Sequence, residues 1–117
     1  STHGPMRSLP LAVLATLTAL ATLMAAAPAT ADRATGRGIA AEQCQPCHGI
    51  DGIALIPEAP NLAGQNRAYL ARQLWAFRAG ERSDQKMSPA ARGLSDDDII
   101  AVADWYSSIA ITVTPPE

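Results

Sequence analysis

The sequence predicts an all-α fold of three to five short helices for the part of the chain that follows residue 31. Apolar residues recur at helical spacing in two segments, and capping residues, glycines and prolines divide the chain at helix ends. No run of residues typical of a β-strand flanks the two cysteines. The chain has 117 residues, and the part after residue 31 suffices for one domain with a modest core. A large apolar cofactor would help to fill such a core.

The first expected helix runs from Thr35 to about Cys44. Two glycines and two prolines interrupt regular structure between residues 49 and 60, so a loop is expected there. A second helix is expected to be capped at residue 65 or 66 and to stop before Gly80. Its apolar residues lie on one helical face and are Leu70, Leu74 and Phe77.

Two further helices are expected near the carboxyl end. Ser88 can act as an N-cap with Pro89 at the first helical position, and Gly93 ends that short helix. Ser95 then opens the last helix, whose first turn carries the acidic residues 96–98 where the helix dipole favours negative charge. The apolar stripe of this helix consists of Ile99, Val102 and Tyr106.

The five residues from Cys44 to His48, Cys-Gln-Pro-Cys-His, form the attachment signature of a c-type haem. Each thiol can add to one vinyl group of the porphyrin. The histidine then lies under the iron with a ring nitrogen free to bind it. We therefore predict one covalent haem c per chain, attached through Cys44 and Cys47, with His48 as an axial ligand of the iron.

Two other sites built from cysteines fit this motif less well. Zinc requires four nitrogen or sulfur ligands, whereas the chain has two cysteines and two histidines, one of them the amino-terminal His3. A thiol–disulfide oxidoreductase is the stronger alternative, because a proline before the second cysteine is common in such pairs. That class expects a βαβ pattern around the cysteines, which this sequence lacks.

Residues 1–31 are expected to be a signal peptide that directs export to the periplasm. Met6-Arg7 supplies a basic start, an apolar stretch follows, and Ala29-Thr30-Ala31 supplies the small residues of a cleavage site. The alternative is a retained anchor on the periplasmic face of the inner membrane, because residues 8–31 carry no charge over a length that can span a bilayer. Contact with a membrane is expected only in that second case.

The charge balance argues against a nucleic-acid partner. The chain has nine Lys and Arg against eleven Asp and Glu, and Lys86 is its only lysine. A nucleic-acid-binding domain requires a basic face.

Met87 is the expected second axial ligand, because the chain beyond residue 31 has no other methionine and no histidine besides His48. It lies between expected helices, just after the polar residues 83–86. A methionine that packs under a helix is the alternative. A thioether is a soft neutral ligand that favours Fe(II) and fills the coordination sphere, which is typical of a one-electron carrier rather than a catalyst.

Over about residues 36–109 the chain resembles class I c-type cytochromes, and within them the bacterial cytochrome c4 and c553 group. The resemblance begins at the haem signature and continues through Ala59–Gln65, Tyr69-Leu70, Gln73-Leu74, Phe77, Gly80–Arg82, Met87, Leu94–Ile99 and Trp105-Tyr106. It implies a small cytochrome c domain over residues 32–111, with residues 112–117 as a flexible tail. Cytochromes c4 carry two such domains, so this chain resembles a single-domain relative.

The resemblance also implies roles for four residues outside the signature. The backbone carbonyl of Pro60 would accept a hydrogen bond from the second ring nitrogen of His48. Gly36 would let the first and last helices pack closely. Arg82 and Trp75 are candidates to hydrogen-bond a haem propionate, with surface or packing roles as the alternative.

These observations predict a periplasmic one-electron carrier rather than an enzyme, with donor and acceptor proteins as its partners. One alternative is a cytochrome subunit of a dehydrogenase or sulfur-oxidising enzyme, and another is a haem enzyme or gas sensor with an open iron site. The apolar residues 53–56 are expected to pack on the haem, or else to form a weak docking patch.

Overall fold

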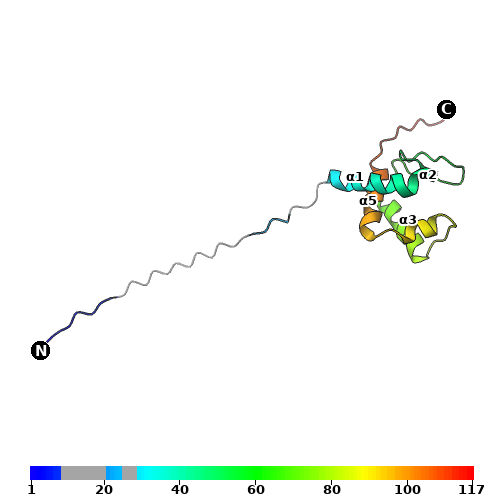
Figure 1. Cartoon of the computed structure of the whole chain (residues 1–117). Helices are drawn as coiled ribbons and strands as arrows, with labels where there is room; N and C mark the ends of the chain where they lie inside the picture. The colour runs from blue at the N-terminus through cyan, green and yellow to red at the C-terminus, as the bar shows by residue number, and fades with distance from the viewer. Residues whose placement is uncertain (9–20, 25–28) are drawn as a thin grey trace.

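The computed structural model describes residues 1–8, 21–24 and 29–117, and within these residues all regular structure is helical. The predicted all-α class is therefore confirmed. Figure 1 shows the helices gathered into one body from which the carboxyl-terminal tail extends. The elements in chain order are α1 (Ala29–Ile39), the π turn η1 (Ala40–Cys44), α2 (Gln45–His48), α3 (Arg67–Ala79), α4 (Met87–Arg92) and α5 (Asp96–Ser107).

The first helical segment is longer than the sequence predicted. Helix α1, the π turn and α2 follow one another without a break from Ala29 to His48, so the haem signature lies at the end of a helix. Pro46 lies in the first turn of α2, directly after the π turn. The π turn immediately before α2 widens the helix at the first cysteine, and such turns often accompany functional sites.

The expected leader falls largely on residues 9–20 and 25–28, which lie outside the described residues. The three residues of the expected cleavage site, 29–31, belong to the first turn of α1. Among the helices that the structure describes, none combines the length and the apolar character needed to cross a membrane.

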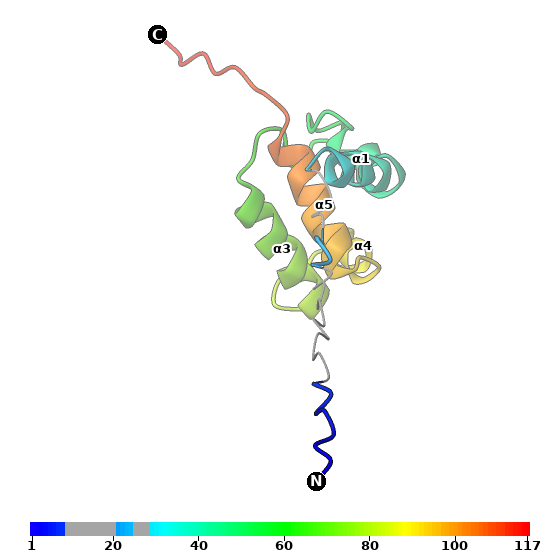
Figure 2. The same ribbon diagram turned by 90° about the vertical axis from the view of Figure 1, so that its left-hand side faces the viewer.

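Helix α1 packs most extensively against α5, and Figure 2 shows α1 at one end of α5 with α3 lying alongside it. A Cβ atom at Gly36 would lie only 2.0 Å from the backbone oxygen of Ala101 and 3.1 Å from Cβ of Trp105. Backbone at that distance cannot yield as a flexible side chain would, so the crossing requires glycine. This close approach fixes the helix that carries the haem signature against the last helix.

The ends of α3 and α5 agree with the sequence prediction. The side chain of Asn66 caps α3 by accepting a hydrogen bond from the Tyr69 N–H, and Gly80 ends it in the left-handed conformation with φ of 78°. At the start of α5, the side chains of Ser95 and Asp98 each accept a hydrogen bond from the other residue's backbone N–H.

The prediction of Ser88 as the N-cap of α4 is wrong, because the first helical residue is Met87, two residues before the expected Pro89. The carboxylate of Asp84 accepts the backbone N–H groups of Lys86 and Met87, at 2.8 and 2.9 Å. Ser88 lies inside the helix, and its hydroxyl oxygen accepts the Asp84 N–H at 3.0 Å. Asp84, three residues before Met87, thus accepts the hydrogen bonds at the start of α4 that the sequence pattern had assigned to Ser88.

The buried core is formed by residues of η1, α3, α5 and the connection before α5, and it includes the apolar stripe predicted for α5. Its buried residues are Ala40, Leu70, Ala71, Leu94, Ile99, Val102, Ala103 and Tyr106.

Candidate haem-binding site

A cavity of about 660 Å³ opens beside this core, a volume in the range of sites for cofactors and other organic ligands. Its walls come from the end of the first helical segment, the loop that follows, α3, and the segment from residue 82 to α5. Many of the lining residues are apolar, among them Ile56, Leu62, Leu70, Leu74, Phe77, Ala90, Ala91, Leu94 and Val102.

Six of the seven residues that the sequence singled out line this one cavity. They come from three separate parts of the chain and are Cys44, Cys47, His48, Pro60, Arg82 and Met87. Trp75 is not among the lining residues. The cavity thus brings together two thiols, an imidazole and a thioether in largely apolar surroundings.

The orientation of His48 follows from its hydrogen bond. The side chain is buried, and its Nδ1 lies 2.9 Å from the backbone oxygen of Pro60. A carbonyl oxygen can only accept, so Nδ1 carries the proton and donates it. The other ring nitrogen, Nε2, therefore keeps its lone pair for a metal.

The Cys44 thiol differs from the reactive thiol of a redox-active cysteine pair. Burial raises the pKa of the Cys44 thiol to about 11, whereas reactive cysteines have lowered pKa values that favour the thiolate. The part of the chain that the structure describes also contains no strand from which a βαβ unit could be built. Both observations oppose the thiol–disulfide oxidoreductase interpretation.

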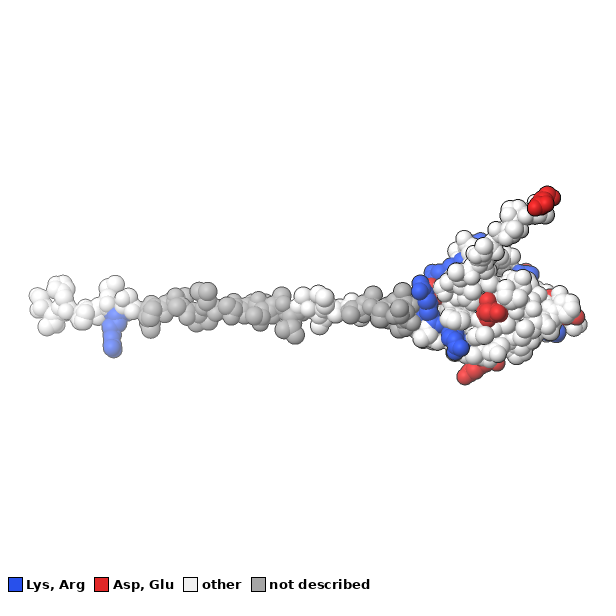
Figure 3. Space-filling model, turned by 90° about the horizontal axis from the view of Figure 1, so that it is seen from above, with Lys and Arg blue, Asp and Glu red and all other residues white. Residues whose placement is uncertain are grey.

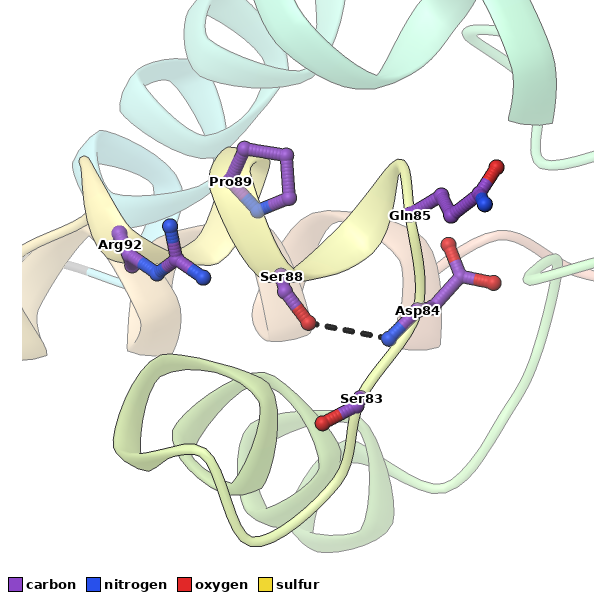
Figure 4. A pocket seen from close by; sticks show the side chains of 6 residues that line it. All are labelled: Ser83, Asp84, Gln85, Ser88, Pro89 and Arg92. Atoms are coloured by element: carbon purple, nitrogen blue, oxygen red, sulfur yellow. Dashed lines mark hydrogen bonds between the residues drawn. The ribbon is translucent and has the colours of Figure 1, made fainter.

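Met87 occupies the first position of α4 and is partly buried where it faces the cavity. The sequence placed it in a connection between helices, and the structure instead places it at a helix start. A hollow of about 570 Å³ lies on the outer side of the same segment. Figure 4 shows the residues that line it, among which the Asp84 N–H donates a hydrogen bond to the Ser88 hydroxyl oxygen.

The two candidates for a propionate contact differ in their surroundings. Arg82 lies at the cavity, where its guanidinium donates to Oε1 of Gln73 at 2.6 Å and stands 4.5 Å from the centre of the Phe77 ring. Trp75 lies elsewhere, and its indole N–H donates to the Asp96 carboxylate at 3.1 Å. Trp75 therefore serves the contact between α3 and α5.

Two residues of α5 have a part in this site that the sequence reasoning missed. The hydroxyl of Tyr106 donates to the backbone oxygen of Gly49 at 2.8 Å, and the indole N–H of Trp105 donates to that of Ile50 at 2.9 Å. The backbone oxygen of Tyr106 in turn accepts the N–H of Gly64 at 3.0 Å. Tyr106 thus holds both ends of the loop that carries Pro60.

A signal for this arrangement was present in the sequence. Tyrosine and tryptophan on an apolar helical stripe have polar tips that need hydrogen-bond partners when they are buried. Tyr106 is 0% exposed, so its hydroxyl needs such a partner. The identity of the partner could not be predicted, since Gly49 lies 57 residues away along the chain.

The residues present fit a covalently attached haem. Two thiols lie on adjacent turns of a helix end, the tautomer of His48 leaves Nε2 for iron, and a thioether lines the same apolar cavity. Cysteine, histidine and methionine are the side chains that c-type cytochromes use for attachment and ligation.

Comparison with known proteins establishes the family. Residues 31–105 match the family profile described as cytochrome C oxidase, cbb3-type, subunit III. The chain therefore belongs to this family of cytochrome c domains, and it is a class I c-type cytochrome with covalent haem c. Its class is one of electron-transfer proteins rather than enzymes.

Named relatives agree with this assignment. Cytochrome c-554(548) of Halomonas halodenitrificans is 47% identical over 68 residues, which cover 56% of this chain and 82% of that protein. Cytochrome c4 of Thiocapsa roseopersicina is 37% identical over 84 residues, which cover 72% of this chain and 43% of that protein. The thiosulfate dehydrogenase electron acceptor of Stutzerimonas stutzeri is 34% identical over 111 residues, which cover 78% of this chain and 51% of that protein.

A solved structure shows the same fold. The reduced recombinant cytochrome c4 from Pseudomonas stutzeri superposes with a TM-score of 0.63 at 30% sequence identity. The match covers 69% of this chain and 50% of the cytochrome c4 chain. The chain thus spans about half the length of the cytochrome c4 relatives that it matches, and most of the length of cytochrome c-554(548).

Proposed function

We propose that this electron-transfer protein is a periplasmic one-electron carrier in which His48 and Met87 are the two axial ligands of the haem iron. The observation that carries the proposal is that one cavity contains Cys44, Cys47, His48 and Met87. The haem, when bound, supplies a one-electron iron couple.

Each side chain has a distinct task in this proposal. Cys44 and Cys47 hold the cofactor through thioether bonds, and the Nδ1–H bond to Pro60 holds the ring of His48 in one orientation. Met87 contributes a neutral sulfur that favours the reduced state. Because both axial positions are filled by protein, neither oxidation state offers a place for oxygen or a substrate.

Arg82 is the residue that we propose for a haem propionate. Its guanidinium is held at the cavity by Gln73 and the Phe77 ring, and arginine has donors that match a carboxylate. The propionate role proposed for Trp75 has no support, since its N–H is directed to Asp96 outside the cavity.

The surface offers a place for weak encounters with redox partners. Ile53 is 49% and Leu55 is 64% exposed, and the Leu55 N–H donates to the backbone oxygen of Cys47 at 2.8 Å. Ile56, in contrast, lines the cavity, so the apolar run divides between the two expected uses. On the face shown in Figure 3, charged side chains are interspersed in a mostly uncharged surface. Such surfaces suit small transient interfaces.

A potentiometric titration of the haem-loaded protein tests the carrier function. We expect a reversible transition that fits one electron, and no change in the spectrum of the reduced protein under carbon monoxide. An irreversible or absent transition would refute the proposed function as an electron carrier. Rapid binding of carbon monoxide would support the alternative of an open haem enzyme or gas sensor.

The periplasmic location is tested by isolating the mature protein. If the leader is removed after Ala31, amino-terminal sequencing of the holoprotein from the periplasmic fraction should begin at Asp32. Recovery of the uncleaved chain in the membrane fraction would support the anchored form.

A second candidate function is to accept electrons from an enzyme that oxidises sulfur compounds. The similarity to the thiosulfate dehydrogenase electron acceptor of Stutzerimonas stutzeri favours it. Stopped-flow mixing of the ferric protein with a thiosulfate dehydrogenase and thiosulfate should then reduce the haem quickly. Reduction no faster than with thiosulfate alone would argue against this partner.

A further inference from the structure

We propose that Asp84 and Ser88 are positioning residues that hold Met87 in place as an iron ligand. The proposal rests on the axial ligation by Met87 proposed above. It concerns a cap at the start of α4, which differs from other caps in this fold because the first helical residue is the ligand itself.

The cap consists of two reciprocal contacts. The Asp84 carboxylate accepts the N–H of Met87 at 2.9 Å and that of Lys86 at 2.8 Å. The hydroxyl oxygen of Ser88, a buried side chain, accepts the N–H of Asp84 at 3.0 Å, as Figure 4 shows. The Ser88 N–H also donates to the backbone oxygen of Asp84 at 3.1 Å. The residues on both sides of the ligand are thereby tied to one aspartate.

The carboxylate acts on the ligand residue directly. Its hydrogen bond from the Met87 N–H is the largest cause of the lowered pKa of Asp84, with that from Lys86 next. Helix α4 has only six residues, and a helix of that length has little stability of its own. Without the cap, the backbone at Met87 would lose its restraint, and the sulfur would leave the iron more often.

Imidazole binding to the ferric holoprotein measures how often the sulfur leaves. Imidazole competes with Met87 for the iron, so its apparent affinity rises as the native ligand is held less firmly. For Asp84→Ala we expect an increase of roughly three- to tenfold, the factor that corresponds to the loss of a typical helix N-cap. Ser88→Ala should raise the affinity in the same direction by a smaller factor.

Two variants separate positioning from general stabilisation. Asp84→Asn keeps a side-chain oxygen that can accept the two N–H groups and should restore an affinity close to wild type. Asp98→Ala removes the matched carboxylate from the cap of α5, and Asp98 does not line the cavity. It should lower the unfolding midpoint while leaving the imidazole affinity unchanged.

The outcomes distinguish the positioning role of Asp84 and Ser88 from the proposed ligation of the iron by Met87. The ferric visible spectrum of a protein with methionine on the iron contains a weak long-wavelength sulfur-to-iron band. If the wild type shows this band but Asp84→Ala binds imidazole as wild type does, the cap has no positioning role and the ligand assignment stands. An equal increase in Asp98→Ala would reduce the effect to lost stability and overturn the proposal. A wild type without the band would overturn the ligand assignment and the positioning role together.

Discussion

The two sides of the cavity are built in different ways. His48 is held by contacts from distant parts of the chain, since its ring bonds to Pro60 and the loop between them is held by Tyr106. Met87 is held by neighbours, because the contacts at the start of its helix come from Asp84 and Ser88. The partners on the histidine side lie 12 to 57 residues apart, and those on the methionine side two to four.

This difference predicts two kinds of failure. Long-range contacts form with the fold as a whole, so damage on the histidine side should lower the free energy of global unfolding. Local contacts around a short helix can open without unfolding the rest of the protein. Damage on the methionine side should therefore expose the iron to competing ligands while most of the fold persists.

The largest effect is expected where α1 crosses α5. Gly36→Ala places a Cβ atom 2.0 Å from the Ala101 oxygen, so the helices must separate, and the free energy of unfolding should fall by about 3 kcal/mol. Denaturant titration of the holoprotein measures this. The control is Gly38→Ala in the same helix, where a Cβ meets open space and should add about 0.5 to 1 kcal/mol. Equal effects of the two changes would mean that the crossing does not determine stability.

The next effect concerns the tyrosine that holds the loop. Tyr106→Phe removes the shorter of two hydrogen bonds to the Gly49 oxygen, which keeps only the bond from the Gly52 N–H at 3.3 Å, and should lower the free energy of unfolding by about 1 kcal/mol. Imidazole affinity should stay at the wild-type value, in contrast to Asp84→Ala. Ser107→Ala, which removes a neighbouring hydroxyl, should change stability by less than about 0.5 kcal/mol. A tenfold rise in imidazole affinity in Tyr106→Phe would contradict the division between the two sides.

The smallest effect is expected at a contact that belongs to neither side. Hydrogen bonds from Arg78 and then Trp75 hold the pKa of the exposed Asp96 below its ordinary value. A lowered folded-state pKa stabilises the fold above the unfolded value near 4, and this stabilisation is lost as the pH falls through the folded value. The thermal midpoint of wild type should therefore fall more between pH 6 and pH 3 than that of Asp96→Asn. An equal decrease of the thermal midpoint in both proteins would show that the hydrogen bonds of Asp96 to Arg78 and Trp75 have no measurable effect on stability.

Local signals were sufficient for much of the fold and for the haem signature. The caps at Asn66 and Ser95 and the stop at Gly80 depend on residues within one turn, so the sequence could predict them. The predicted start of α4 was wrong because two residues that can cap a helix, Asp84 and Ser88, lie four residues apart. The sequence alone does not show which of them makes the hydrogen bonds. The aspartate was favoured because its carboxylate can accept two backbone N–H groups at once.

The candidate site could be predicted only in part, for a different physical reason. The spacing of the signature identifies attachment and one ligand, and the scarcity of methionine points to Met87. The roles of Tyr106 and Trp105 depend on tertiary contacts across more than 50 residues, which no local pattern encodes. The choice between the two roles considered for Trp75 could not be made from the sequence for the same reason, since its partner Asp96 lies on another helix.

The ferric visible spectrum of the haem-loaded protein tests the central claim, that Met87 completes the coordination of the iron, most directly. We expect a weak long-wavelength sulfur-to-iron band in wild type, a sharp low-spin spectrum after reduction, and loss of the band in Met87→Ala. A high-spin wild-type spectrum without the band, or a band that persists in Met87→Ala, would contradict the account.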